Sequence, residues 1–181
     1  MNSLITVMIL VVAVIILGLA LMSFTASQAS IQSSEIRLMN FINEASSNLI
    51  VYKEYQNGTT LWIGINEVVA EPMVYYVSVF STDWSPIEID TSTSGLVVDN
   101  NLVSTDVESA KVTYVNIMGS GGNFFTLPKY LGFVTLLKVE FSGNPVLLKL
   151  NVEDYSGTCY VLVFIKVGSY YYEVGRITFE V

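Results

Sequence analysis

The sequence predicts an α+β protein in which a long N-terminal hydrophobic α-helix precedes an antiparallel β-sandwich. The helix is predicted because the first 34 of the 181 residues carry no charge and are mostly apolar. The sandwich is predicted because short strand-like runs separated by turns fill the chain from Asn48 onward. Apolar residues make up 52% of the chain and charged residues only 13%, against ~25% charged residues in a typical soluble domain. We therefore expect part of the surface to be covered by lipid or by other copies of the chain.

The first segment, residues 4–21, is apolar at nearly every position. Eighteen helical residues at ~1.5 Å each span ~27 Å, close to the thickness of the hydrocarbon core of a bilayer. Because apolar side chains surround the whole helix axis, the predicted helix has no face suited to water. We expect its large side chains to form an assembly core with other helices. These residues are Leu4, Ile5, Val7, Met8, Ile9, Leu10, Val11, Val12, Val14, Ile15, Ile16, Leu17, Leu19, Leu21 and Phe24.

The second segment, residues 22–49, contains neither Pro nor Gly, so we expect the helix to continue to about residue 48 and the β domain to span 49–181. Ala26, Ser30 and Ser34 are spaced four residues apart, which allows helix backbones to approach closely. The stripe that repeats with 4-3-4 spacing is expected to pack the end of the helix on the β domain. Its residues are Leu38, Ile42, Ala45 and Leu49.

Three interpretations of the apolar segment compete. A secretory signal peptide is suggested by the triplet Ser27-Gln28-Ala29, but no basic residue precedes the apolar run, and the run exceeds an ordinary signal core. A permanent membrane anchor normally has flanking Lys or Arg residues, which are missing here. We favour a helix that assembles with copies of itself.

The remainder of the chain is expected to form nine or ten short strands. The dipeptide Asn57-Gly58 between two such runs is a strong hairpin signal. Residues 160–165 are apolar without clean alternation, which predicts a central strand covered on both faces. The expected strands are 51–56, 59–65, 73–80, 87–89, 96–103, 111–118, 132–141, 146–152, 159–167 and 170–181.

Composition argues against most catalytic chemistry. The chain has no His and a single Cys, Cys159, which excludes Ser-His-Asp and Cys-His catalysis and any intrachain disulfide. The glycine-rich segment 119–123 lacks the Lys-Ser/Thr of a phosphate-binding loop, and neither 153–154 nor 99–101 matches a calcium loop. We therefore expect no enzyme activity, no catalytic or metal site and no cofactor. A formal net charge of −8 also disfavours nucleic acid as a partner.

One modification site is suggested by the sequence. Asn57-Gly58-Thr59 matches the N-x-S/T sequon for N-glycosylation. It lies at the predicted hairpin tip, where a glycan on Asn57 would project without disturbing the core.

An uncharged apolar helix over residues 4–21, a continuation rich in small polar residues and a C-terminal β-sandwich resemble archaeal type IV pilins and archaellins. Bacterial pilins have Glu at the fifth mature residue, whereas this chain has Ile5, as expected for the archaeal branch. The resemblance implies a lollipop-shaped subunit with an Ig-like sandwich, made with a class III signal and cut by a prepilin peptidase. No basic-Gly processing site precedes the apolar run, so Met1 would be the first mature residue.

The resemblance also implies partners and a location. The subunit would be inserted in the membrane before assembly, and an assembly ATPase and a platform protein would draw many identical copies into an extracellular helical filament. We therefore expect a structural subunit of an adhesive surface pilus. The alternatives are an archaellum (motility) filament subunit and a membrane-anchored β-sandwich protein that binds a ligand.

Overall fold

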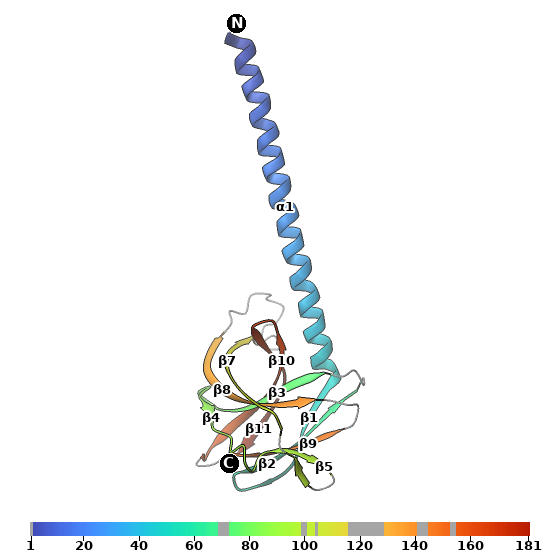
Figure 1. The fold of residues 1–181 in the computed structure, drawn as a ribbon, viewed down its shortest axis with the longest axis vertical. Helices are drawn as coiled ribbons and strands as arrows, with labels where there is room; N and C mark the ends of the chain where they lie inside the picture. The colour runs from blue at the N-terminus through green and yellow to red at the C-terminus, as the bar shows by residue number, and fades with distance from the viewer. Residues whose placement is uncertain are drawn as a thin grey trace. The chain divides into compact units, whose positions relative to one another are not determined.

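A computed structural model describes residues 2–68, 73–98, 101–103, 105–115, 129–140, 145–152 and 155–181. It contains the helix α1 (Asn2–Asn48) followed by two β-sheets (Figure 1). The predicted α+β class and the predicted helix are thereby confirmed. The helix passes through Gly18 without interruption.

The chain divides into two compact units, Met1–Phe41 and Ile42–Val181. The expected boundary at 48/49 coincides with the end of α1, but the β unit already begins inside the helix. The reason is that Ile42 and Ala45, in the last turns of α1, are buried. We call Ile42–Val181 the β unit.

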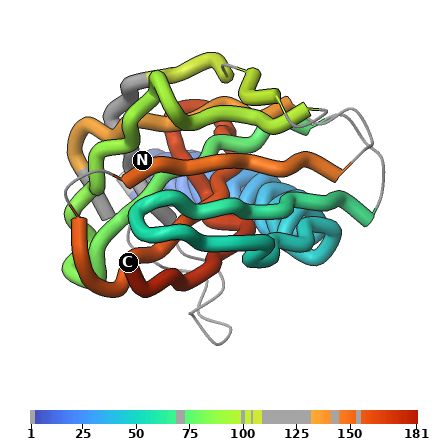
Figure 2. Tube along the Cα trace, turned by 90° about the horizontal axis from the view of Figure 1, so that it is seen from below, coloured from blue at the N-terminus to red at the C-terminus, as the bar shows by residue number. Residues whose placement is uncertain are grey.

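The first sheet is fully antiparallel, with strand order β1-β2-β9-β5-β6. Figure 2 shows β2 lying between β1 and β9. The strands are β1 (Leu49–Asn57), β2 (Thr60–Glu67), β9 (Val146–Asn151), β5 (Gly95–Val98) and β6 (Asn101–Val103).

The second sheet has the order β10-β11-β7-β8-β3-β4, and β10 also pairs with β3. Five of its strands therefore close into a ring, which the sandwich prediction did not include. Closure depends on a short parallel pairing of β11 with β7, whereas the other pairs are antiparallel. The strands are β3 (Val74–Ser81), β4 (Pro86–Ile87), β7 (Val107–Val115), β8 (Lys129–Glu140), β10 (Thr158–Val167) and β11 (Tyr170–Glu180).

The central strand β10 is buried on both faces, as predicted for residues 160–165. Leu162 and Phe164 belong to a cluster on one face, with Tyr76, Phe80, Val134, Leu136 and Tyr171. Val161 and Val163 point to the opposite face because side chains alternate along a strand, and they are fully buried as well. Leu49 and Val51 of β1, in the first sheet, lie against this face, because a Cβ atom at Gly175, the partner of Val163 in β11, would lie 3.0 Å from Leu49 Cδ2 and 2.9 Å from Val51 Cγ2.

Two local predictions were wrong in detail. The β1–β2 turn is made by Gly58-Thr59, because Asn57 pairs with Thr60, whereas Asn57-Gly58 was expected. Gly58 has φ 55° and Thr59 has no positive φ, which fits a turn with Gly at its first central position. The expected strand 96–103 is a hairpin of β5 and β6, because Asp and Asn, which favour turns, interrupt the apolar run.

The predicted strand ends at 116–118 and 141 lie outside the described residues.

Candidate assembly interface

The first unit exposes large apolar side chains around the helix. The fifteen residues expected to form the assembly core are all exposed, with relative exposures between 49% at Val11 and 70% at Leu4. No charge occurs before Glu35. Burial of one such side chain stabilises it by ~1.5–3 kcal/mol, so this surface is suited to lipid or to other helices.

The helix α1 has the length and the composition needed to cross a membrane, and none of its apolar window is buried. Signal sequences near an N-terminus meet the same criterion, as do core helices of soluble proteins. The absence of buried residues in this window sets that part of α1 apart from a core helix, because such a helix is mostly buried by its own domain.

Hydroxyl groups in the middle of α1 are hydrogen-bonded within the helix. Thr25 Oγ1 donates to the carbonyls of Leu21 and Met22 at 3.0 Å, and Ser34 Oγ donates to the carbonyl of Ser30 at 3.0 Å. A hydroxyl that bonds to its own helix loses little when it leaves water. Thr25 and Ser34 therefore keep a hydrogen-bond partner where this uncharged part of α1 leaves water.

The end of α1 is fixed within the β unit. Ile42 and Ala45 are 1% exposed, and Leu49 at the start of β1 is 9% exposed. Ser46 Oγ donates to the carbonyl of Val174 in β11 at 2.9 Å, and the carbonyl of Asn48 accepts from the N–H of Val68 at 2.9 Å. Three of the four residues expected to pack this end are thus buried.

Leu38, the fourth of them, is half-buried.

Further apolar residues of α1 are exposed that the sequence analysis did not assign to the interface. They are Met22, Ile31, Ile36 and Phe41, with exposures of 72%, 49%, 53% and 43%. Ile36 and Phe41 fall outside the 4-3-4 stripe, which is the sequence signal for their exposure, whereas Ile31 lies seven residues before Leu38 on the same side of the helix and carries no such signal. The exposed apolar surface extends past the first charges to Phe41.

Asn57 is exposed at the end of β1. Thr59, the third residue of its sequon, donates a hydrogen bond from Oγ1 to Asn151 Oδ1 at 3.1 Å. The hairpin tip therefore presents the Asn57 side chain to solvent.

Of the residues considered for other chemistry, the segments 119–123, 153–154 and 99–100 lie outside the described residues. Cys159 is fully buried, and burial raises the pKa of its thiol to about 11. Among the described residues, no three or more His, Cys, Asp or Glu side chains gather where they could hold a metal ion.

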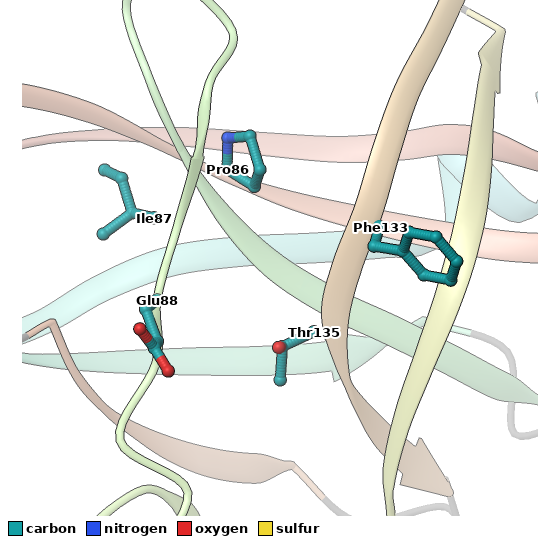
Figure 3. A pocket seen from close by; sticks show the side chains of 5 residues that line it. All are labelled: Pro86, Ile87, Glu88, Phe133 and Thr135. Atoms are coloured by element: carbon teal, nitrogen blue, oxygen red, sulfur yellow. The ribbon is translucent and has the colours of Figure 1, made fainter.

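A shallow pocket of about 200 Å³ lies between β8 and the segment that includes β4 (Figure 3). Pro86, Ile87 and Glu88 line one side, and Phe133 and Thr135 of β8 line the other. Glu88 is the one charged side chain among these five lining residues, and we assign no chemistry to this pocket.

Comparison with protein-family models, with curated proteins and with solved structures found no match to this chain.

Proposed function

We propose that this chain is the structural subunit of an extracellular helical filament, an adhesive surface pilus of the archaeal type IV class. The observation that carries the proposal is the exposure of all fifteen core residues in a helix with no charge before Glu35. The filament is a homopolymer held by α1, and nucleic acid is not a partner.

The energy of covering α1 is large compared with the stability of one domain. Sixteen large apolar side chains lie between Leu4 and Phe24. At ~1.5–3 kcal/mol each, their burial is worth ~25–50 kcal/mol, against ~5–15 kcal/mol for folding a typical domain. Whatever covers this helix therefore decides where the chain resides.

Length favours a helix bundle as the final environment. Residues 2–34, at ~1.5 Å each, span ~50 Å, whereas the hydrocarbon core of a bilayer is ~30 Å thick. A bundle of identical helices has no such limit. Ala26 and Ser30 allow backbones to approach closely, and packing rather than hydrophobic transfer then supplies the cohesion, since lipid and bundle are both apolar.

The same property suggests the route of assembly. A chain waiting in the membrane moves its helix from lipid into the bundle without exposing it to water. By resemblance to archaeal pilins, an assembly ATPase and a platform protein would drive this transfer, and the β unit would form the outer layer of the filament.

The test is electron microscopy of material sheared from cells that produce the chain. Val14 in the proposed core is 60% exposed and Val68 after β2 is 64% exposed, so Val14→Asp and Val68→Asp form a matched pair. We expect filaments from the wild type and Val68→Asp and none from Val14→Asp. Filaments of normal number from Val14→Asp would contradict the proposal.

A second candidate function is a membrane-anchored β-sandwich binding protein, favoured by the membrane-crossing length and composition of α1. It predicts that detergent extracts a stable monomer and that no filaments form. An archaellum subunit would use α1 in the same way, and loss of swimming in the Val14→Asp strain would identify it.

A further inference from the structure

The outward side of the first sheet carries apolar side chains where an exposed antiparallel sheet usually carries polar ones. Residues paired across neighbouring strands point to the same side of a sheet. Tyr52 pairs with Gly64, Gly64 with Leu147, Leu147 with Val97, and Val97 with Leu102. This row crosses all five strands, and its two ends, Tyr52 and Leu102, are 40% and 41% exposed.

A second row runs beside the first. Tyr55 pairs with Trp62, and Trp62 pairs with Lys149. Tyr55 is 57% exposed, and Lys149 Nζ lies 6.0 Å from the centre of the Trp62 ring. We call the two rows together the outer face.

The outer face has little charge. Lys149 is the one charged side chain in its two rows, and neither row contains an acid, although the chain has 16 acidic and 8 basic residues. Two strongly negative molecules repel each other at most contacts. The paired residues of the two rows bring no carboxylate to such a contact, although the exposed Glu54 lies beside them in β1, at the bulge between Lys53 and Tyr55.

The ring of Tyr52 lies close against the sheet on the outer face. A Cβ atom at Gly64 would collide with the ring of Tyr52, so the ring lies against the sheet over this glycine. Only glycine permits this close approach. The ring thus presents a fixed surface and loses little freedom on contact with a partner.

We propose that the outer face is a contact between neighbouring copies of this chain in the filament, an inference that rests on the proposed function. Aromatic and aliphatic side chains with few charges are typical of the core of a protein interface. Because each copy in a helical polymer meets the next through two different surfaces, the outer face would meet another surface of the next copy.

The size of the outer face indicates whether this contact alone could hold two copies together. Five strands spaced ~4.8 Å apart, with about six residues each at ~3.3 Å, give the whole outward side of the sheet an area of roughly 500 Å², and the outer face is part of it. A stable pair of free proteins buries ~800 Å² on each partner. The face is too small to hold free chains together, but it stabilises copies that α1 already brings together.

The first test compares Tyr55→Glu with Tyr170→Glu, which places the same change on a tyrosine of β11 that is 44% exposed. Filaments of both variants are heated in steps and pelleted, and the fold of each chain is checked by circular dichroism in detergent. We expect Tyr55→Glu to leave at least ~10-fold less pelletable filament than Tyr170→Glu at the temperature where half of the wild type remains, a difference of ~1.4 kcal/mol. Equal amounts would overturn the inference.

The second test detects the contact directly in sheared filaments; a failure to obtain filaments overturns the proposed function and this inference with it, whereas filaments without the contact overturn the inference alone. Tyr55→Cys and Tyr170→Cys are labelled in the filaments with maleimide-benzophenone and illuminated; the buried Cys159 does not compete for the label. A dimer band from Tyr55→Cys and not from Tyr170→Cys supports a contact between copies. Absence of that band overturns it. A third outcome also overturns the inference: the wild type is retained on insoluble cellulose, Tyr55→Glu abolishes this retention, and no dimer band forms. That outcome would indicate that the outer face binds a sugar.

Discussion

The helix α1 and the strand β10 have nearly the same kind of side chains and opposite surroundings. Val14 and Ile15 of α1 are 60% and 55% exposed, whereas Val163 and Ile165 of β10 are 0% and 3% exposed. In the β unit, the ring of strands covers one face of β10 and the first sheet covers the other. The first unit offers no such cover to α1. The β unit therefore completes its own core, whereas the apolar side chains of residues 4–24 lie uncovered, as the proposed helix bundle requires.

The largest predicted effect comes from placing a charge in each region. Val163→Asp buries a carboxylate in the β unit, and we expect it to cost more than ~4 kcal/mol and to prevent cooperative folding. Val14→Asp should leave the melting of the β unit in detergent unchanged while it abolishes filaments. Thermal melting followed by circular dichroism, together with electron microscopy, separates the two. A lowered melting temperature in Val14→Asp would show that α1 belongs to the same folding unit.

A glycine substitution in each region should give a smaller difference in stability. A Cβ at Gly175 in β11 would lie 2.9 Å from Val51 Cγ2 and 3.0 Å from Leu49 Cδ2, whereas a Cβ at Gly18 meets nothing within 4 Å. We expect Gly175→Ala to destabilise the β unit by ~1–3 kcal/mol, as overpacking does. Gly18→Ala should leave the β unit unchanged and favour the helix by ~0.5–1 kcal/mol. Denaturant unfolding in detergent measures both, and equal stabilities would refute the close approach of β1 to β11.

The two regions should also respond differently to acid. Glu108 Oε1 lies 2.7 Å from Lys166 Nζ, and the hydrogen bond from Lys166 lowers the pKa of Glu108. A lowered folded-state pKa means that the carboxylate stabilises the β unit above its unfolded pKa, ~4.3, and that this contribution is lost as the pH falls through the lower folded value. Both side chains are more than a third exposed, so the effect is below ~1 kcal/mol.

The measurement is the melting temperature of wild type and Glu108→Gln between pH 7 and pH 3. We expect the wild type to be slightly more stable at pH 7 and the difference to vanish toward pH 3. Residues 2–34 contain no titratable side chain, so the cohesion of the helices should not follow this titration. A constant difference across the whole pH range would exclude the ion pair as its cause.

The smallest effect on stability is expected at Asn57. If the exposed sequon carries a glycan, Asn57→Gln lowers the mass of the subunit by the mass of that glycan, while the melting of the β unit stays the same. Mass spectrometry of filament protein measures the difference. Equal masses after allowance for the substitution would show that Asn57 is unmodified.

The sequence predicted those parts of the fold that depend on local patterns. The apolar run and the absence of Pro and Gly from residues 22–49 predicted the extent of α1. The unbroken apolar run at 160–165 predicted that β10 is covered on both faces. The fifteen residues of the proposed core followed from composition alone, because apolar side chains all around a helix leave no face for water.

The closure of the ring could not be predicted in this way. It needs β11 to pair with β7, and no local pattern encodes which distant strands become neighbours. The sequence analysis did not identify the outer face for the same reason. Tyr52, Trp62 and Leu147 each fit a strand, but only the register of β1, β2 and β9 places them on one side of the sheet.

The most direct measurement is a high-resolution electron cryo-microscopy reconstruction of filaments sheared from producing cells. We predict that residues 4–24 of every subunit lie at the filament axis, with the same residues of neighbouring subunits packed around them. Filaments whose axis is built from any other part of the chain, or a chain found in membranes as single subunits with residues 4–24 surrounded by lipid alone, would contradict the account.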